Sequence, residues 1–90
     1  MSEKLRLREA GLEWRTVDGE VVALDVAASA YLAVNESGRL LWEALGAGTT
    51  RGKLIELLTA NYGLDRTVAE RDIDEFLAEL GRRGLLEAQG

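Results

Sequence analysis

The first third of the chain alternates apolar and polar residues. Leu12–Val17 has the pattern of a strand with one solvated face. The dipeptide Asp18–Gly19 follows, which tolerates the positive φ angles of a type I′ turn, and Glu20–Asp25 returns as a second strand. The small residues Ala27–Ser29 form another connection, and Ala30–Val34 is rich in strand formers. These segments predict an antiparallel meander whose first and third strands lie at its edges.

From Asn35 onward the apolar residues recur at helical spacing. Asn35 is suited to cap a first helix, which the glycines of Gly46–Gly48 would end. Thr49 or Thr50 is suited to cap a second helix, which Gly63 would end. The apolar residues expected on these helices are Leu40, Leu41, Trp42, Ala44, Leu45, Leu54, Ile55, Leu57, Leu58 and Tyr62.

A third helix is predicted before the end of the chain. Thr67–Glu70 has the pattern of a capping box, and Gly81 or Gly84 would end the helix. The tail Leu85–Glu87 is apolar enough to pack back as a short strand. The expected fold class is therefore α+β, with a three-stranded antiparallel meander followed by three helices in a winged helix-turn-helix-like arrangement.

Length and composition indicate one small domain over residues 1–90, with flexible ends at about 1–6 and 88–90. Ninety residues suffice for a single modest core, and an apolar share of 47% with a charged share of 30% is typical of globular chains. We find no stretch long and apolar enough to cross a bilayer and no signal-peptide core. We therefore expect a cytoplasmic protein with no membrane partner.

Enzymatic chemistry is disfavoured by the residues that the chain lacks. With no Cys and no His, it has no thiolate or imidazole metal ligand, no Cys nucleophile and no usual general base. We therefore expect a protein that is not an enzyme and that needs no metal or other cofactor. The net charge of −5 repels nucleic acid, although charge alone is a weak argument.

Several motifs suggest chemistry, but each has a plainer structural interpretation. Gly46–Gly52 has GxGxxxG spacing after a helix, which favours an interhelical loop over a nucleotide-binding loop. Glu75 and Glu79 lie one helical turn apart, and the charges around them favour a solvated helix face over an acid-base pair. Trp14 and Trp42 sit in apolar patterns, which makes core positions more probable than binding positions.

The alternative function is a winged-helix DNA-binding regulator. In such proteins the third helix enters the major groove and contacts phosphates. Here Arg82 and Arg83 would have to dominate a helix whose expected exposed face is mostly acidic. The acidic positions on that face are Glu70, Asp72, Asp74, Glu75 and Glu79.

The third predicted strand has an unguarded edge. Natural sheets protect exposed edges with charges, prolines or bulges, yet Ala30–Val34 contains no charge and no proline, whereas Glu13 and Arg15 guard the first strand. A helix, the N-terminal segment or a second copy of the chain could cover this edge. The functional interpretation is β-augmentation, in which an extended peptide adds as a further strand beside a groove.

These features together resemble the PqqD-like proteins, the recognition elements for precursors of ribosomally synthesised, post-translationally modified peptides (RiPPs). The likeness is greatest to the stand-alone recognition proteins of lasso-peptide pathways. It extends from about Leu7 to Glu87, and it rests on the order and spacing of its motifs. The matching segments are Trp14–Glu20, Leu24–Asp25, Asn35–Gly38, Leu41–Trp42, Tyr62, Asp72–Leu80 and Gly84–Leu86.

The resemblance implies a function and a set of binding residues. A precursor leader peptide would add as an antiparallel strand to the third strand and pack against the third helix, with Val34 in the core. The chain would present the leader to a leader peptidase or a radical SAM enzyme, and we expect it to be a monomer. The implied peptide-binding residues are Ala30, Tyr31, Leu32, Ala33, Val34, Asp72, Glu75, Phe76 and Glu79.

Overall fold

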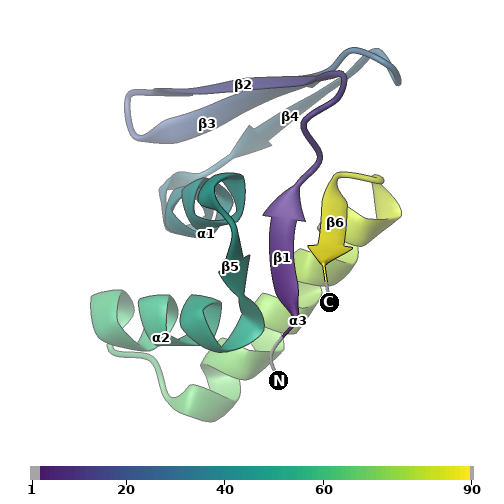
Figure 1. The fold of residues 1–90 in the computed structure, drawn as a ribbon. Helices are drawn as coiled ribbons and strands as arrows, with labels where there is room; N and C mark the ends of the chain where they lie inside the picture. The colour runs from purple at the N-terminus through teal and green to yellow at the C-terminus, as the bar shows by residue number, and fades with distance from the viewer. Residues whose placement is uncertain (1–2, 90) are drawn as a thin grey trace.

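The computed structural model describes residues 3–89 of the chain as two small sheets and three helices (Figure 1). The α+β class and the order of meander and helices are those predicted. The elements in chain order are β1 (Lys4–Leu7), β2 (Leu12–Val17), β3 (Glu20–Asp25), β4 (Ala30–Val34), α1 (Glu36–Ala47), β5 (Thr49–Thr50), α2 (Arg51–Tyr62), α3 (Arg66–Arg82) and β6 (Leu86–Gln89).

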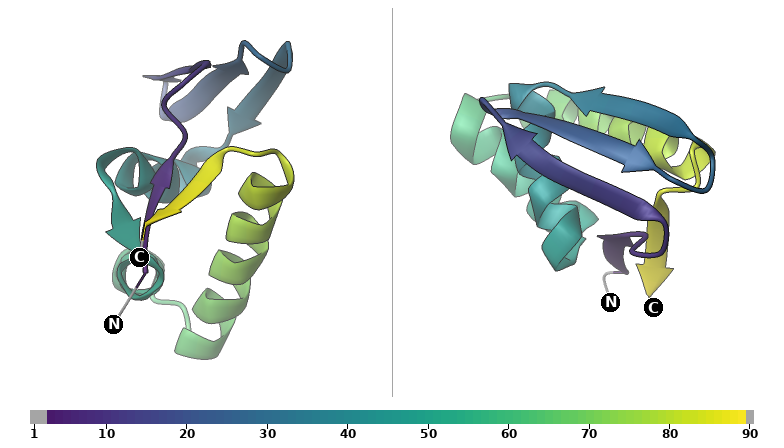
Figure 2. Two further views of the ribbon diagram at one scale, coloured as in Figure 1. Left: turned by 45° about the vertical axis from the view of Figure 1, so that its right-hand side comes forward. Right: turned by 90° about the horizontal axis from the view of Figure 1, so that it is seen from above.

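The meander β2-β3-β4 forms as predicted, with β2 and β4 at its edges. Asp18 and Gly19 have φ angles of 51° and 83°, so both occupy the left-handed region that a type I′ turn requires. The turn pairs Val17 with Glu20, and β4 pairs with β3 so that Val34 lies opposite Val21. Figure 2 shows this sheet from above, with β4 as the outer strand on the side of α3.

The strands β5, β1 and β6 form a second sheet in that order. Flexible ends were expected instead, at about residues 1–6 and 88–90. Within the described residues, Lys4–Leu7 pairs with β6, and Ala88 lies opposite Leu5. Leu5 and Leu7 are buried, so the alternation at the start of the chain marks a strand with one core-facing side. The expectation for residues 1–2 and 90 lies outside the described residues.

The helix ends agree with the sequence at two of the three N-termini. The Asn35 side chain accepts a hydrogen bond from the Gly38 amide, and the Thr50 hydroxyl accepts one from the Lys53 amide. The capping box at Thr67–Glu70 was a wrong prediction, because α3 begins at Arg66 after Asp65, whose side chain makes no capping hydrogen bond. Since backbone carbonyls can satisfy early amides, a capping pattern inside a helix need not mark its start.

The core lies between the meander and the helices. Its largest fully buried side chains include Trp42, Leu54 and Ile73, one from each helix. Trp14 packs edge-on against Trp42 with ring centroids 6.1 Å apart, but its own side chain remains 38% exposed. Trp42 is thus a core residue as expected, whereas Trp14 lies at the core margin.

An ion pair links the two sheets near the start of β4. The guanidinium of Arg8 donates to the Asp25 carboxylate at 2.6 Å and to the Gly84 carbonyl at 2.9 Å. The Ala28 amide also donates to Asp25. Burial raises the pKa of the Asp25 carboxyl, but the hydrogen bonds from Arg8 and Ala28 outweigh it, so this pKa lies below its ordinary value.

We expect Asp25→Asn to weaken the fold at neutral pH and to flatten its acid dependence. The pKa of Asp25 is lowered in the folded state, so the ionised carboxylate stabilises the fold above the ordinary Asp pKa of about 3.9. This contribution disappears as the pH falls through the folded-state pKa. Urea unfolding of both proteins from pH 3 to pH 7 measures the difference in their free energies of unfolding. If the free energy of unfolding falls with pH equally steeply in both proteins below pH 4, the prediction is contradicted.

Candidate functional site

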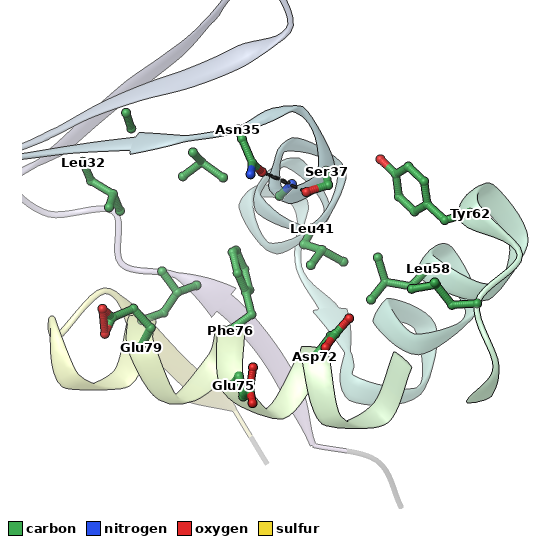
Figure 3. A pocket seen from close by; sticks show the side chains of 15 residues that line it. Leu32, Asn35, Ser37, Leu41, Leu58, Tyr62, Asp72, Glu75, Phe76 and Glu79 are labelled. Atoms are coloured by element: carbon green, nitrogen blue, oxygen red, sulfur yellow. Dashed lines mark hydrogen bonds between the residues drawn. The ribbon is translucent and has the colours of Figure 1, made fainter. Parts of the chain in front are cut away.

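A groove of about 680 Å³ lies between β4 and α3. The beginning of α1 and the end of α2 complete its walls, so all three helices contribute to it (Figure 3). The lining residues come from positions 32–41, 58–64 and 72–80, which are far apart in the sequence. The predicted residues Leu32, Ala33, Val34, Asp72, Glu75, Phe76 and Glu79 all lie on this groove.

The floor of the groove is apolar. Phe76 projects from α3 toward β4 and α1, and Leu41 and Leu58 lie further along the same cavity (Figure 3). Gly38 allows α1 to approach β4 closely, because a Cβ atom at this position would clash with the Val34 side chain. Gly38 therefore lets the start of α1 form this wall of the groove close to β4.

Acidic side chains line the α3 rim. Glu79 accepts a hydrogen bond from Arg82 at 2.7 Å and lies 3.7 Å from Arg83. The hydrogen bond from Arg82 holds the pKa of Glu79 below its ordinary value. Asp72 has a distant pairing with Arg71 at 3.9 Å, and Glu75 has no ion pair within residues 3–89. The charged residues of α3 that line the groove are thus all carboxylates, and Arg71, Arg82 and Arg83 flank them outside its lining.

The register of the meander identifies which backbone groups of β4 remain open. In a two-residue hairpin the flanking pair Val17–Glu20 is hydrogen-bonded, so alternate residues of β3 face β2 and the residues between them face β4. The Val26 amide, which donates to the Gly11 carbonyl on the β2 side, agrees with this phase. It follows that Leu32 and Val34 bond to β3, whereas the N–H and C=O groups of Tyr31 and Ala33 face outward.

The two faces of β4, which the sequence could not tell apart, differ in their surroundings. Leu32 and Val34 face the helices, and Val34 is buried as the family resemblance implied. Tyr31 and Ala33 face the other side of the sheet, where the Tyr31 side chain is 75% exposed. The main groove is therefore lined by the Leu32 side chain and not by the Tyr31 ring.

A smaller cavity of about 140 Å³ continues the groove at the start of β4. Ala30 and Tyr31, the two predicted residues absent from the main groove, line this cavity together with Leu32. Arg83 and Asp25 supply its charged side chains. The two cavities share Leu32, and their linings together include every peptide-binding residue predicted from the sequence.

Sequence reasoning missed the contributions of α1 and α2 to the site. Asn35, Ser37 and Gly38 line the groove, and so does Tyr62, which is 44% exposed. Asn35 was recognised as a helix cap and Tyr62 as a helix residue, but neither was assigned to the site. The available signal was that Tyr62 is one of the positions that carry the family resemblance.

Two negative findings concern only the part of the chain that the structure describes. None of its helices is long and apolar enough to cross a membrane. No group of three or more His, Cys, Asp or Glu side chains in it is arranged to hold a metal ion.

The fold and the groove define a small α+β domain with an open sheet edge beside an apolar cavity. The family model for coenzyme PQQ synthesis protein D (PqqD) matches residues 20–86, and the chain belongs to this family. A search of curated protein sequences found no significant match.

Two solved structures are similar over nearly the whole chain. "TbiB1 in Complex with the TbiA(beta) Leader Peptide" has a TM-score of 0.84 and 28% identity, covering 91% of this chain and 94% of that one. "Lasso peptide synthetase B1 complexed with the leader peptide" has a TM-score of 0.81 and 29% identity, covering 92% of this chain and 96% of that one. The fold is thus that of proteins solved with peptides bound.

Proposed function

We propose that this chain binds the leader segment of a ribosomally made precursor peptide and presents it to a processing enzyme. The leader adds as a strand to β4, and its inward side chains enter the groove against α3. The observation that carries this proposal is the open edge at Tyr31 and Ala33 beside a cavity of about 680 Å³.

The similar structures support this assignment. TbiB1 and lasso peptide synthetase B1 are both described in complex with a leader peptide. The name of the second favours the lasso-peptide branch, in which the processing enzyme is a separate leader peptidase, over a radical SAM partner. The partner enzyme, the monomeric state and a cytoplasmic location all belong to this proposal.

The energetics of strand addition fit a reversible recognition role. Backbone hydrogen bonds supply affinity without reading sequence, and side chains in the groove supply specificity. A short added strand with one or two buried anchors reaches a Kd of about 1 μM, or roughly −8 kcal/mol. Affinity of this order allows the leader to be released after processing.

We assign no catalytic step to the chain. It contains neither Cys nor His, and two carboxylates of α3, Asp74 and Glu79, are engaged by arginines. The DNA-binding alternative gains no support from the similar structures. It also conflicts with Asp72 and Glu75 on the face of α3 that borders the groove, since phosphate would be repelled there.

Amide hydrogen exchange tests strand addition residue by residue. In the free chain, the Tyr31 and Ala33 amides should exchange rapidly, whereas Leu32 and Val34 should be protected by their bonds to β3. Adding a leader peptide encoded beside this chain should protect Tyr31 and Ala33. If the peptide binds and the Tyr31 and Ala33 amides still exchange rapidly, addition to β4 is disproved.

A further inference from the structure

The charges along the groove are distributed unevenly. Asp72 and Glu75 border the main cavity near the end of β4, where Asn35 also contributes to the lining. Arg83 borders the smaller cavity at the start of β4, beside Ala30. Because α3 progresses from Asp72 to Arg83 while the lining of β4 progresses from Val34 back to Ala30, the two elements lie antiparallel along the groove.

Ion pairs within the chain offset only part of these end charges. Glu79 lies between the two ends of the groove. It forms ion pairs with both Arg82 and Arg83. Asp25, in the smaller cavity, is neutralised by Arg8 at 2.6 Å. One net negative charge remains among Arg71, Asp72 and Glu75 at the Val34 end, and one net positive charge remains among Glu79, Arg82 and Arg83.

The side chains that carry this pattern are accessible to a ligand. The side chain of Asp72 is 43% exposed, and Glu75 and Arg83 are exposed. Figure 3 shows Asp72 and Glu79 at opposite ends of the labelled row on α3, with Phe76 between them. A peptide lying over Phe76 would therefore run from Asp72 and Glu75 toward Glu79, with Arg83 beyond it on the smaller cavity.

We infer that the groove selects a peptide by its charge order as well as by its apolar residues, an inference that rests on leader binding at β4. The peptide carries Lys or Arg where it passes Asp72 and Glu75, apolar side chains over Phe76, and Asp or Glu where it passes Arg83. The meander is antiparallel throughout, and antiparallel ladders are slightly the more stable. The bound strand thus enters at Val34, so its basic residues precede its apolar ones.

The charges reinforce the antiparallel direction, which the backbone ladder favours only slightly. An open edge accepts an added strand in either direction, and apolar contacts over Phe76 discriminate weakly between the two. Each partly exposed charge pair contributes about a two- to fivefold change in affinity. Reversing both Asp72 and Glu75 is therefore expected to weaken a matched peptide about tenfold, and less at high salt because of screening.

Selection from a displayed library of random 12-residue peptides tests this inference with the purified full chain. We expect the enriched peptides to share basic residues, then an apolar centre, then acidic residues. Asp72→Lys with Glu75→Lys should replace the basic preference with an acidic one. Glu20→Lys with Glu56→Lys makes the same change in net charge at exposed positions that line neither cavity, and it should leave the consensus unchanged.

The outcomes separate this inference from the proposed function. Enriched peptides that require the β4 edge but show no charge order would overturn the charge selection and leave strand addition standing. A consensus with acidic residues first would overturn the direction of binding. If no peptide is enriched on the native chain, leader binding itself is contradicted, and the charge order with it.

Discussion

Ala33→Pro is expected to reduce leader affinity about 10- to 100-fold while the domain remains folded. The Ala33 amide faces outward from β4, so proline removes a donor that the leader needs and none that the meander uses. The leader carbonyl that loses its partner remains beside a largely apolar groove, and an unsatisfied group of this kind costs about 1–3 kcal/mol. Fluorescence anisotropy with a labelled leader peptide measures the loss.

Two further variants separate the lost donor from other effects at the same strand. Ala33→Val keeps the amide and favours extended backbone, so leader affinity should change little. Leu32→Pro removes an amide that bonds to β3, and it should destabilise the fold by about 3 kcal/mol or more. Native leader affinity in a folded Ala33→Pro protein would reject strand addition at β4.

Local sequence signals were sufficient to predict the meander. The pair Asp18–Gly19 specifies its turn through positive φ angles, and the alternation on either side fixes the register. Of the second sheet only the tail strand was predicted, at Leu85–Glu87, because the strands of this sheet are short and distant in sequence. The two-residue strand β5 and the pairing of Leu7 with Leu86 depend on how the helices bring the chain ends together.

The site could be predicted in outline but not in its geometry. An uncharged stretch at Ala30–Val34 indicated an open edge, and the family resemblance indicated α3 as the opposite wall. The sequence did not reveal the outward phase of the Tyr31 and Ala33 amides, because that phase also depends on how β4 pairs with β3. Nor did it reveal Gly38, whose role depends on the proximity of the Val34 side chain.

Charge pairing across the helix surface is also hidden in the sequence. Glu75 and Glu79 look equivalent, since they lie one turn apart on the same helix. In the folded chain Glu79 is engaged by Arg82 at 2.7 Å, whereas Glu75 has no ion pair within the described residues. An acidic face inferred from spacing alone therefore overstates the charge that a ligand meets near Glu79.

The purified chain, added in trans, is expected to lower the apparent KM of the processing enzyme for full-length precursor. A domain that holds the leader and also docks on the enzyme makes the encounter of substrate and enzyme effectively intramolecular. Effective concentrations near the millimolar range are typical of short tethers, so the stimulation should be largest when the precursor is dilute. The maximal rate should change little, because the chain contributes no catalytic group.

A titration of the chain against initial processing rate measures this effect with three matched reactions. The native chain should stimulate processing and then inhibit it in excess, because leader-bound and enzyme-bound copies become different molecules. Ala33→Pro should need a much higher concentration to stimulate, whereas Ala33→Val should act like the native chain. Equal stimulation by all three, or processing by the chain without the enzyme, would reject presentation of the leader as its mode of action.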